Sequence, residues 1–338
     1  MKNSTVKEDD SVGVQNPQPP SLLKRRTNSR FTAEEMAGLL QQGATPAFCR
    51  AILQNFVDKK EWLSSPFLKN DSDLLRAAEP LSPNDGTHLL TISDPLYPVD
   101  LLDLQSPPPV LFVKGDLKAL SRGVGIVGSR SMTEFGSLVA TLSAASASAI
   151  GATVVSGLAR GVDSTAHEVA AAAPSRTLAF VGCGLDALDE RQSQLSEKIL
   201  ATGGAICSES LPETPTSPGL LIARNRLIAA MSYPLVVVEG TLDSGTTYTV
   251  RDAAKLGRPM VVALPKEKFR SLPSAKLPLV LADPPKLASS AFKPPLVFEN
   301  VPSSSYSAAN AVCETREDLD NAIKVFWWLH ANENSPDR

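Results

Sequence analysis

The most regular feature of the sequence is an alternation, from Val124 onward, between short apolar runs and longer stretches with helical spacing. The apolar runs are continuous, as in strands that are buried on both faces of a sheet. The strand candidates are 125–127, 153–155, 178–181, 205–207, 235–239 and 260–264. The helix candidates between them are 134–150, 162–172, 191–202, 224–231 and 246–256. This alternation predicts an α/β fold with a doubly wound, mostly parallel sheet and helices on both sides.

The segments outside this region have other patterns. Residues 1–30 are polar and rich in proline, which predicts a disordered tail. Residues 31–85 carry apolar positions at helical spacing, and Thr32 with Glu35 forms a capping-box pattern, so we expect a small helical domain of the SAM or helix-hairpin-helix kind. The core is predicted at 86–285, including a possible strand at 277–281. Residues 286–338 form a C-terminal extension without a recognisable winged helix, with a loop at 303–306 and a helix at 319–330 whose aromatic stripe serves packing.

Small, polar or basic residues follow the first predicted strand, at the edge where parallel sheets bind ligands. Gly128-Ser129-Arg130 precedes a helix that is predicted to start near Thr133. Amides at a helix N-terminus attract anions, and Gly128 lets a ligand approach the backbone. Ser129 and Arg130 can both donate hydrogen bonds to a phosphate. The alternative is a tight strand–helix turn that carries a surface arginine.

Three further segments have the same character. Their candidate residues are Ser156, Gly157 and Arg160 after the second strand, Arg224, Asn225 and Arg226 at a helix start, and Ser244 and Gly245 before the helix at 246–256. The alternatives are structural. We expect Asp163 to cap a helix and His167 to make a structural hydrogen bond. One of the two arginines at 224 and 226 could pair with a carboxylate such as Glu239, and Ser244 could be a plain helix cap.

Composition narrows the classes of partner. The formal net charge is −3 and the pI about 5.8, so any nucleic-acid site has to be a local patch. The four cysteines and three histidines lack ligand-like spacing, which predicts free, buried thiols and no metal. We see no signal peptide and no apolar run of ~20 residues, so we expect a cytoplasmic protein without a membrane segment.

Motifs of common nucleotide enzymes do not fit. Gly123, Gly125 and Gly128 satisfy G-x-G-x-x-G, but two of these glycines precede or begin the strand, whereas a dinucleotide site needs them after it. The sequence has no P-loop and no G-x-S-x-G elbow.

An ordered set of short motifs carries a family resemblance. The segments are Tyr97-Pro98, 127–130 (VGSR), 156–167 (SGLARGVDSTAH), 182–186 (GCGLD), Ser208-Glu209, 224–229 (RNRLIA), 236–239 (VVVE) and Ser244-Gly245. In this order they resemble the DNA-processing protein A (DprA/Smf) family of bacteria.

The resemblance implies an extended Rossmann-like fold that forms a homodimer and binds single-stranded DNA in a positive pocket. It also implies protection of incoming DNA and loading of the recombinase RecA in natural transformation and recombination, with no catalysis and no cofactor. By matching position, Gly128, Ser129 and Arg130 are the leading phosphate-binding candidates. The other candidates are Ser156, Gly157, Arg160, Arg224, Asn225, Arg226, Ser244 and Gly245.

The sequence departs from the family at several points. Asp189-Glu190-Arg191-Gln192 stands where the family has Tyr-Pro and basic residues or Asn, with Arg191 as a possible substitute.

An alternative function is a nucleotide-binding or nucleotide-hydrolysing enzyme related to the lonely-guy phosphoribohydrolases. Thr249 stands where that reaction needs a carboxylate, which argues against it. A third alternative is a scaffold that binds only a partner protein.

Overall fold

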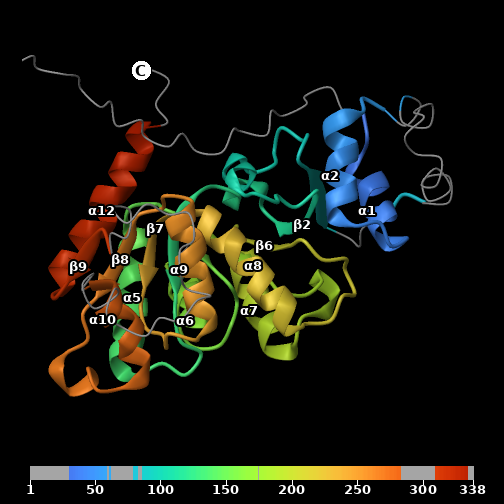
Figure 1. The fold of residues 1–338 in the computed structure, drawn as a ribbon. Helices are drawn as coiled ribbons and strands as arrows, with labels where there is room; N and C mark the ends of the chain where they lie inside the picture. The colour runs from blue at the N-terminus through green and yellow to red at the C-terminus, as the bar shows by residue number, and fades with distance from the viewer. Residues whose placement is uncertain are drawn as a thin grey trace, which may run out of the picture.

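The computed structural model describes residues 30–58, 61, 79–82, 86–173, 175–282 and 309–333. The predicted tail, apart from Arg30, and the predicted loop at 303–306 lie outside these ranges. Within them, one nine-stranded sheet runs through the molecule with helices on both faces (Figure 1). The predicted α/β fold of the doubly wound, mostly parallel, Rossmann-like type is therefore confirmed.

The six predicted strands form the parallel part of the sheet. They are β3 (Gly123–Val127), β4 (Val154–Ser156), β5 (Thr177–Phe180), β6 (Ala205–Ser208), β7 (Ser232–Val237) and β8 (Met260–Ala263). Their spatial order is β6-β5-β4-β3-β7-β8. Almost every residue in them is buried, as their continuous apolar runs predicted. Because the chain returns to the other side of β3 when it forms β7, the order reverses there, and a crevice is expected at that edge.

Three further strands at the two edges were not predicted. β1 (Thr87–Thr91) and β2 (Val110–Gly115) pair with each other antiparallel, and β2 also pairs antiparallel with β6. At the other edge, β9 (Ala311–Cys313) pairs parallel with β8. Part of the segment after residue 286 therefore belongs to the sheet.

Helices cover both faces of the sheet. On one face lie α5 (Glu134–Ala149), α6 (Val162–Ala172) and α12 (Arg316–Glu333), with α7 (Glu190–Ala201) packed beside α6. On the other face α8 (Pro218–Ala230) packs against α9 (Gly245–Lys255). The 3-10 helices are η2 (Val99–Asp103), η3 (Leu117–Ala119), η4 (Leu185–Ala187), η5 (Glu267–Phe269) and η6 (Pro273–Ala275). Gly151, Gly203 and Gly257 follow α5, α7 and α9 with positive φ, as left-handed caps require.

Two predicted elements were wrong. The helix that we started at Arg224 begins at Pro218, because Ser217 accepts from the Leu220 amide as N-cap and proline fits the first helical position. Residues 277–281 are not a strand but part of helix α10 (Lys276–Ala282). The spacing of four between Leu277 and Leu281 places both buried side chains on one helical face.

The N-terminal helices α1 (Ala33–Gln41) and α2 (Pro46–Asn55) are the described part of the predicted helical domain. Thr32 and Glu35 form the predicted capping box. Met36 and Ile52 are buried in a hydrophobic cluster that also contains residues of β1 and β2. The helices thus pack on the antiparallel edge of the sheet, while the domain boundary near residue 85 stays a prediction.

The C-terminal helix α12 confirms the helix predicted at 319–330, and its aromatic stripe serves packing only in part. Leu319 and Ile323 are buried, and Phe326 and Trp327 pack against the core beneath α5. The Trp328 side chain is 63% exposed. No helix among the described residues is both long and apolar enough to cross a membrane.

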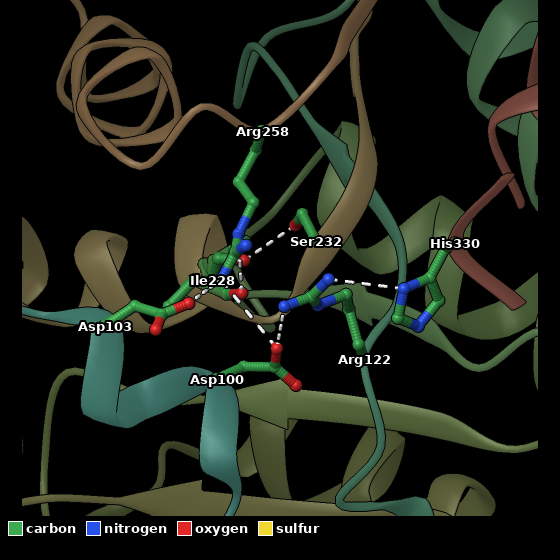
Figure 2. A network of polar contacts seen from close by, with 8 residues as sticks. Asp100, Asp103, Arg122, Ile228, Ser232, Arg258 and His330 are labelled. Atoms are coloured by element: carbon green, nitrogen blue, oxygen red, sulfur yellow. Dashed lines mark hydrogen bonds and ion pairs between the residues drawn. The ribbon is translucent and has the colours of Figure 1, made fainter. Parts of the chain in front are cut away.

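A polar network fixes the amino ends of β3 and β8 (Figure 2). Arg258 donates to Asp103 Oδ2 at 2.7 Å and to the carbonyl oxygen of Ala230 at 3.2 Å. Arg122 pairs with Asp100 of η2 and donates to Nδ1 of His330 at 3.2 Å. The network therefore connects η2, which precedes the parallel strands, with the end of α12.

We expect the free energy of unfolding to depend on pH through His330, which takes part in this network. Burial, and after it the positive charge of Arg122, lower the pKa of His330 to about 4; Asp100 opposes the shift and Arg258 adds to it. The unfolded chain therefore binds more protons between pH 6.5 and 4, and the free energy of unfolding falls as the pH is lowered through that range.

The measurement compares urea unfolding of the wild type and His330→Gln at pH 7 and pH 5. His167 has a pKa lowered in the same direction, so the difference between the two proteins isolates His330. We expect the wild type to lose more stability than the variant. Equal losses would contradict a role of His330 in the network.

Candidate functional site

A pocket of about 580 Å³ opens at the carboxyl edge of the sheet, where the strand order reverses between β3 and β7. Its wall is formed by residues 127–131 after β3, by Ala159 and Asp163, by one side of α8, and by residues 241–249 at the start of α9. This is the position at which open α/β sheets bind ligands. Its volume lies in the ~300–1,000 Å³ range of pockets that bury drug-sized molecules.

Most of the predicted site residues meet at this pocket. Those that line it are Gly128, Ser129, Arg130, Arg224, Asn225, Ser244 and Gly245. Those that do not are Ser156, Gly157, Arg160 and Arg226. Candidates from three of the four segments therefore meet at the pocket, and the segment after β4 contributes Ala159 and Asp163 instead of its candidates.

The loop after β3 presents Arg130 to solvent and holds its own shape. The Ser129 hydroxyl donates to the Ser131 carbonyl oxygen at 2.9 Å and accepts from the Ser131 amide at 3.1 Å. A Cβ at Gly128 would lie 2.7 Å from a methyl group of Val162, so the loop passes α6 at a distance that only glycine allows. Arg130 is exposed and makes no ion pair with any described residue.

Glu239 anchors the end of this loop. Its carboxylate is buried and accepts from the Thr133 amide at 2.9 Å and from the Thr133 hydroxyl. Thr133 in turn caps α5 by accepting from the Gly136 amide at 3.1 Å. The loop between β3 and α5 is thus tied to the end of β7 across the crevice.

Arg224 has a structural position rather than an open one. It is buried, donates to the carbonyl oxygen of Phe180 at 3.1 Å and lies 3.9 Å from the carboxylate of Asp163. Burial lowers the pKa of Arg224 and raises that of Asp163, although each partner opposes the shift of the other. A Cβ at Gly157 would overlap with the Arg224 guanidinium. Gly157 therefore leaves space for this pair and does not contact the pocket.

The remaining residues after β4 also support the fold. Ser156 is buried and donates to the Ile126 carbonyl oxygen at 2.6 Å. Leu158 has a φ of 57°, an uncommon conformation for leucine, and its carbonyl oxygen accepts from Arg191 at 2.8 Å. Arg191 thus stabilises this loop from α7. Arg160 is exposed, outside the pocket wall.

Two predicted interactions have other partners in the structure. Asp163 does not cap α6, whose N-cap is Gly161; its carboxylate instead accepts from the amides of Gly157 and Ala159. One of the arginines at 224 and 226 was expected to pair with a carboxylate such as Glu239; both pair with a carboxylate, but these are Asp163 and Glu209. Sequence spacing gave the side chains but not these long-range pairings.

The start of α9 forms the opposite wall of the pocket. Asn225 donates to the Gly245 carbonyl oxygen at 3.1 Å and so holds this start against α8. Ser244 occupies the N-cap position but makes no side-chain cap; its hydroxyl donates to the Thr241 carbonyl oxygen at 2.7 Å. The first amides of α9 thus lack a side-chain acceptor, which leaves the positive end of the helix dipole available to an anion.

His167 and the four cysteines have the structural positions that the sequence predicted. His167 is buried, and its Nδ1 lies 2.7 Å from the hydroxyl of Thr177. All four cysteines are free and buried. The described residues contain no group of three or more His, Cys, Asp or Glu side chains that could hold a metal ion.

The sequence analysis did not predict the apolar and aromatic part of the pocket wall. Leu221 and Ile222 of α8 and Tyr248 of α9 line it, and Asp243 lies at its exposed rim. The charged side chains in the wall are Arg130, Arg224, Asp163 and Asp243, so the pocket is balanced in formal charge. The spacing of Gly245 and Tyr248 within one helical turn was the available signal for the aromatic residue.

Comparisons with known proteins point to one family. The model of the family described as DNA recombination-mediator protein A matches residues 88–280. Protein Smf of Escherichia coli is 35% identical over 208 residues, which cover 61% of this chain and 54% of that protein. DNA processing protein DprA of Bacillus subtilis is 34% identical over 186 residues, which cover 54% of this chain and 62% of that protein. The chain thus spans little more than half the length of these relatives.

Two solved structures of DNA processing protein A also match this chain. The structure that describes the single-stranded DNA binding mode of DNA processing protein A from Helicobacter pylori matches with a TM-score of 0.50 and 29% identity, covering 58% of this chain and 87% of that one. DNA processing protein A from Streptococcus pneumoniae matches with a TM-score of 0.51 and 23% identity, covering 76% and 94%. The second likeness concerns the fold alone.

Proposed function

Because this chain belongs to the DNA recombination-mediator protein A family, we propose that it binds single-stranded DNA in the pocket between β3 and β7. The observation that carries the proposal is that two groups suited to an anion face one pocket at the switch point of the sheet. They are the exposed Arg130, which has no ion-pair partner among the described residues, and the uncapped start of α9. The H. pylori relative, which is described as a single-stranded DNA binder, supports the same assignment.

Phosphate groups fit the polar parts of this pocket. The Arg130 guanidinium can make a two-pronged contact with a phosphate, and the first amides of α9 offer a second position for negative charge. Gly128, Ser129, Ser244 and Gly245 shape the backbone at these two positions. Arg224 and Asn225 act mainly by positioning, since their guanidinium and amide groups already bond to the protein. Arg160 would meet the strand only beyond the pocket rim.

The balanced charge of the pocket predicts modest affinity for a single site. Few phosphates are neutralised, and each contributes only ~0.7 to the log–log salt slope for single strands. We therefore include a homodimer in the proposal, in which two pockets hold one strand and gain avidity without new contacts. Measuring the affinity of a monomeric variant tests this part, because equal affinity would remove the need for a dimer.

The wider role follows from family membership and stays within the proposal. A protein that covers single-stranded DNA can protect incoming strands and present them to the recombinase RecA in the cytoplasm during transformation. The proposal assigns no catalytic group. The phosphoribohydrolase alternative gains no support, because Thr249 is buried where that chemistry needs a carboxylate, and Asp163 is paired with Arg224.

We expect Arg130→Ala to weaken binding of a labelled strand of ~20–35 nucleotides at least about tenfold, since a charge-assisted hydrogen bond contributes ~1.5–3 kcal/mol. The salt slope should fall by about 0.7 for each phosphate that the variant no longer neutralises. Fluorescence polarisation at two salt concentrations, with the matching duplex as competitor, measures both effects.

Arg176→Ala is the matched control. Arg176 is also exposed, but it precedes β5 and so lies at the amino ends of the strands, away from the pocket at their carboxyl ends. Its removal should leave affinity unchanged. Equal losses of affinity in both variants would indicate nonspecific attraction. No preference of the wild type for single strands over duplex would contradict the proposed function itself.

A further inference from the structure

The pocket has two chemically different walls. Gly128, Ser129 and Arg130 on one side offer polar groups, whereas Leu221, Ile222 and Tyr248 offer apolar and aromatic surface from α8 and α9. Ile222 is 41% exposed, which is high for an isoleucine in the wall of a concave site. A nucleotide has the same division into a charged phosphate and an apolar base face.

Tyr248 is the one aromatic residue among the described residues that line the pocket. It lies in the first turn of α9 and is half-buried, so its ring is in part accessible. Arg251, one turn further along α9, places its Cζ 5.3 Å from the centre of the ring. At this distance the guanidinium attracts the ring by a cation–π interaction and stabilises its orientation.

Arg251 holds the ring through this contact. It makes no ion pair with a described residue, and its Nε is buried without a hydrogen-bond partner. Its charge also opposes the rise that burial causes in the pKa of Asp252. Arg251 is not among the residues of the pocket wall, so its part in binding is to support Tyr248.

We propose that Tyr248, supported by Arg251, is a stacking platform for one base of the bound strand, with Leu221 and Ile222 beside it and the adjoining phosphate at Arg130. This inference rests on the proposed function and adds the groups that recognise the bases. It predicts a preference for single strands, because the bases of a duplex are already paired and stacked inside the helix. Every base has a π face, so the platform discriminates little between sequences.

The experiment compares a labelled thymidine strand with an abasic strand of the same length, which keeps the phosphates but has no bases. The wild type should bind the intact strand roughly 5- to 150-fold more tightly, the effect of one stacked base. Tyr248→Leu should lose most of this ratio while it binds the abasic strand as well as the wild type does. Tyr248→Phe and Tyr248→Trp should retain the ratio, because both keep an aromatic ring.

Trp328→Leu is the matched control, since Trp328 is an exposed aromatic residue of α12 that does not line the pocket. It should leave the ratio unchanged. A Tyr248→Leu variant that keeps the full ratio, or a Tyr248→Phe variant that loses it, would overturn the platform while single-strand binding stands. A wild type that binds neither strand would overturn the platform and the proposed function together.

Discussion

Replacing Arg224 by methionine is expected to lower the free energy of unfolding by about 3–5 kcal/mol, because it leaves the carboxylate of Asp163 buried without its cation. Methionine keeps much of the volume of the side chain, so the loss of stability reports on charge rather than on a cavity. The carbonyl oxygen of Phe180 also loses its donor. Urea unfolding followed by circular dichroism measures the change.

The double variant Arg224→Met/Asp163→Asn shows how much of the lost stability comes from leaving the Asp163 carboxylate without its partner. Removing both charges eliminates the uncompensated carboxylate, so we expect the double variant to be more stable than Arg224→Met alone. If the urea concentration at the midpoint of unfolding is the same for Arg224→Met and the wild type, the buried pair contributes nothing to stability, and Arg224 could instead contact a ligand.

This prediction changes how binding data on Arg224 are interpreted. An Arg224 variant that no longer binds DNA has lost the support between α6, α8 and β5 as well as a positive charge in the pocket wall. Arg130 is therefore the better position for testing phosphate contacts, since its side chain is exposed and its removal leaves no buried group unpaired.

Glu239→Ala is expected to have the second largest effect, a decrease of roughly 3 kcal/mol in the free energy of unfolding. Two charge-assisted hydrogen bonds to Thr133 disappear, each of which contributes ~1.5–3 kcal/mol, and relaxation of the loop recovers part of that. Because Thr133 ends the loop that carries Arg130, single-strand affinity should also fall about tenfold, as in Arg130→Ala.

Thr133→Val is the graded control for Glu239→Ala. It removes the hydroxyl, and with it both the cap on the Gly136 amide and the hydroxyl bond to Glu239, but keeps the bond from the Thr133 amide to Glu239. We expect a destabilisation of about 2 kcal/mol, because the N-cap and one of the two charge-assisted bonds are lost, with a smaller effect on binding. A Glu239→Ala protein that is destabilised yet binds single strands normally would contradict the positioning role of Glu239.

The sequence patterns predicted the parallel core well for a physical reason. Strands buried on both faces have to be continuously apolar, and the helix starts at Thr32 and Thr133 carry side chains that satisfy free amides. These signals are local. The edge strands β1 and β9 are less completely buried and their runs are short, so the same criterion did not find them.

The candidate site was predicted in its location but not in its inner arrangement. Parallel strands end at one edge, so the loops after β3 and β7 had to meet, and seven of the eleven candidates line the pocket. The pairing of Arg224 with Asp163 and of Arg226 with Glu209 depends on how α8 lies on the sheet. Local spacing carries no information about that placement.

The crevice between β3 and β7 also has a consequence for folding kinetics. Gly128 and Ser244 line the same pocket although most of the parallel sheet lies between them in the chain. Contacts between residues so far apart in the chain form late, because bringing them together costs the conformational entropy of the long segment between them. On refolding, the capacity to bind a strand should therefore return after most of the helical signal, and nascent chains that end before α9 should lack it altogether.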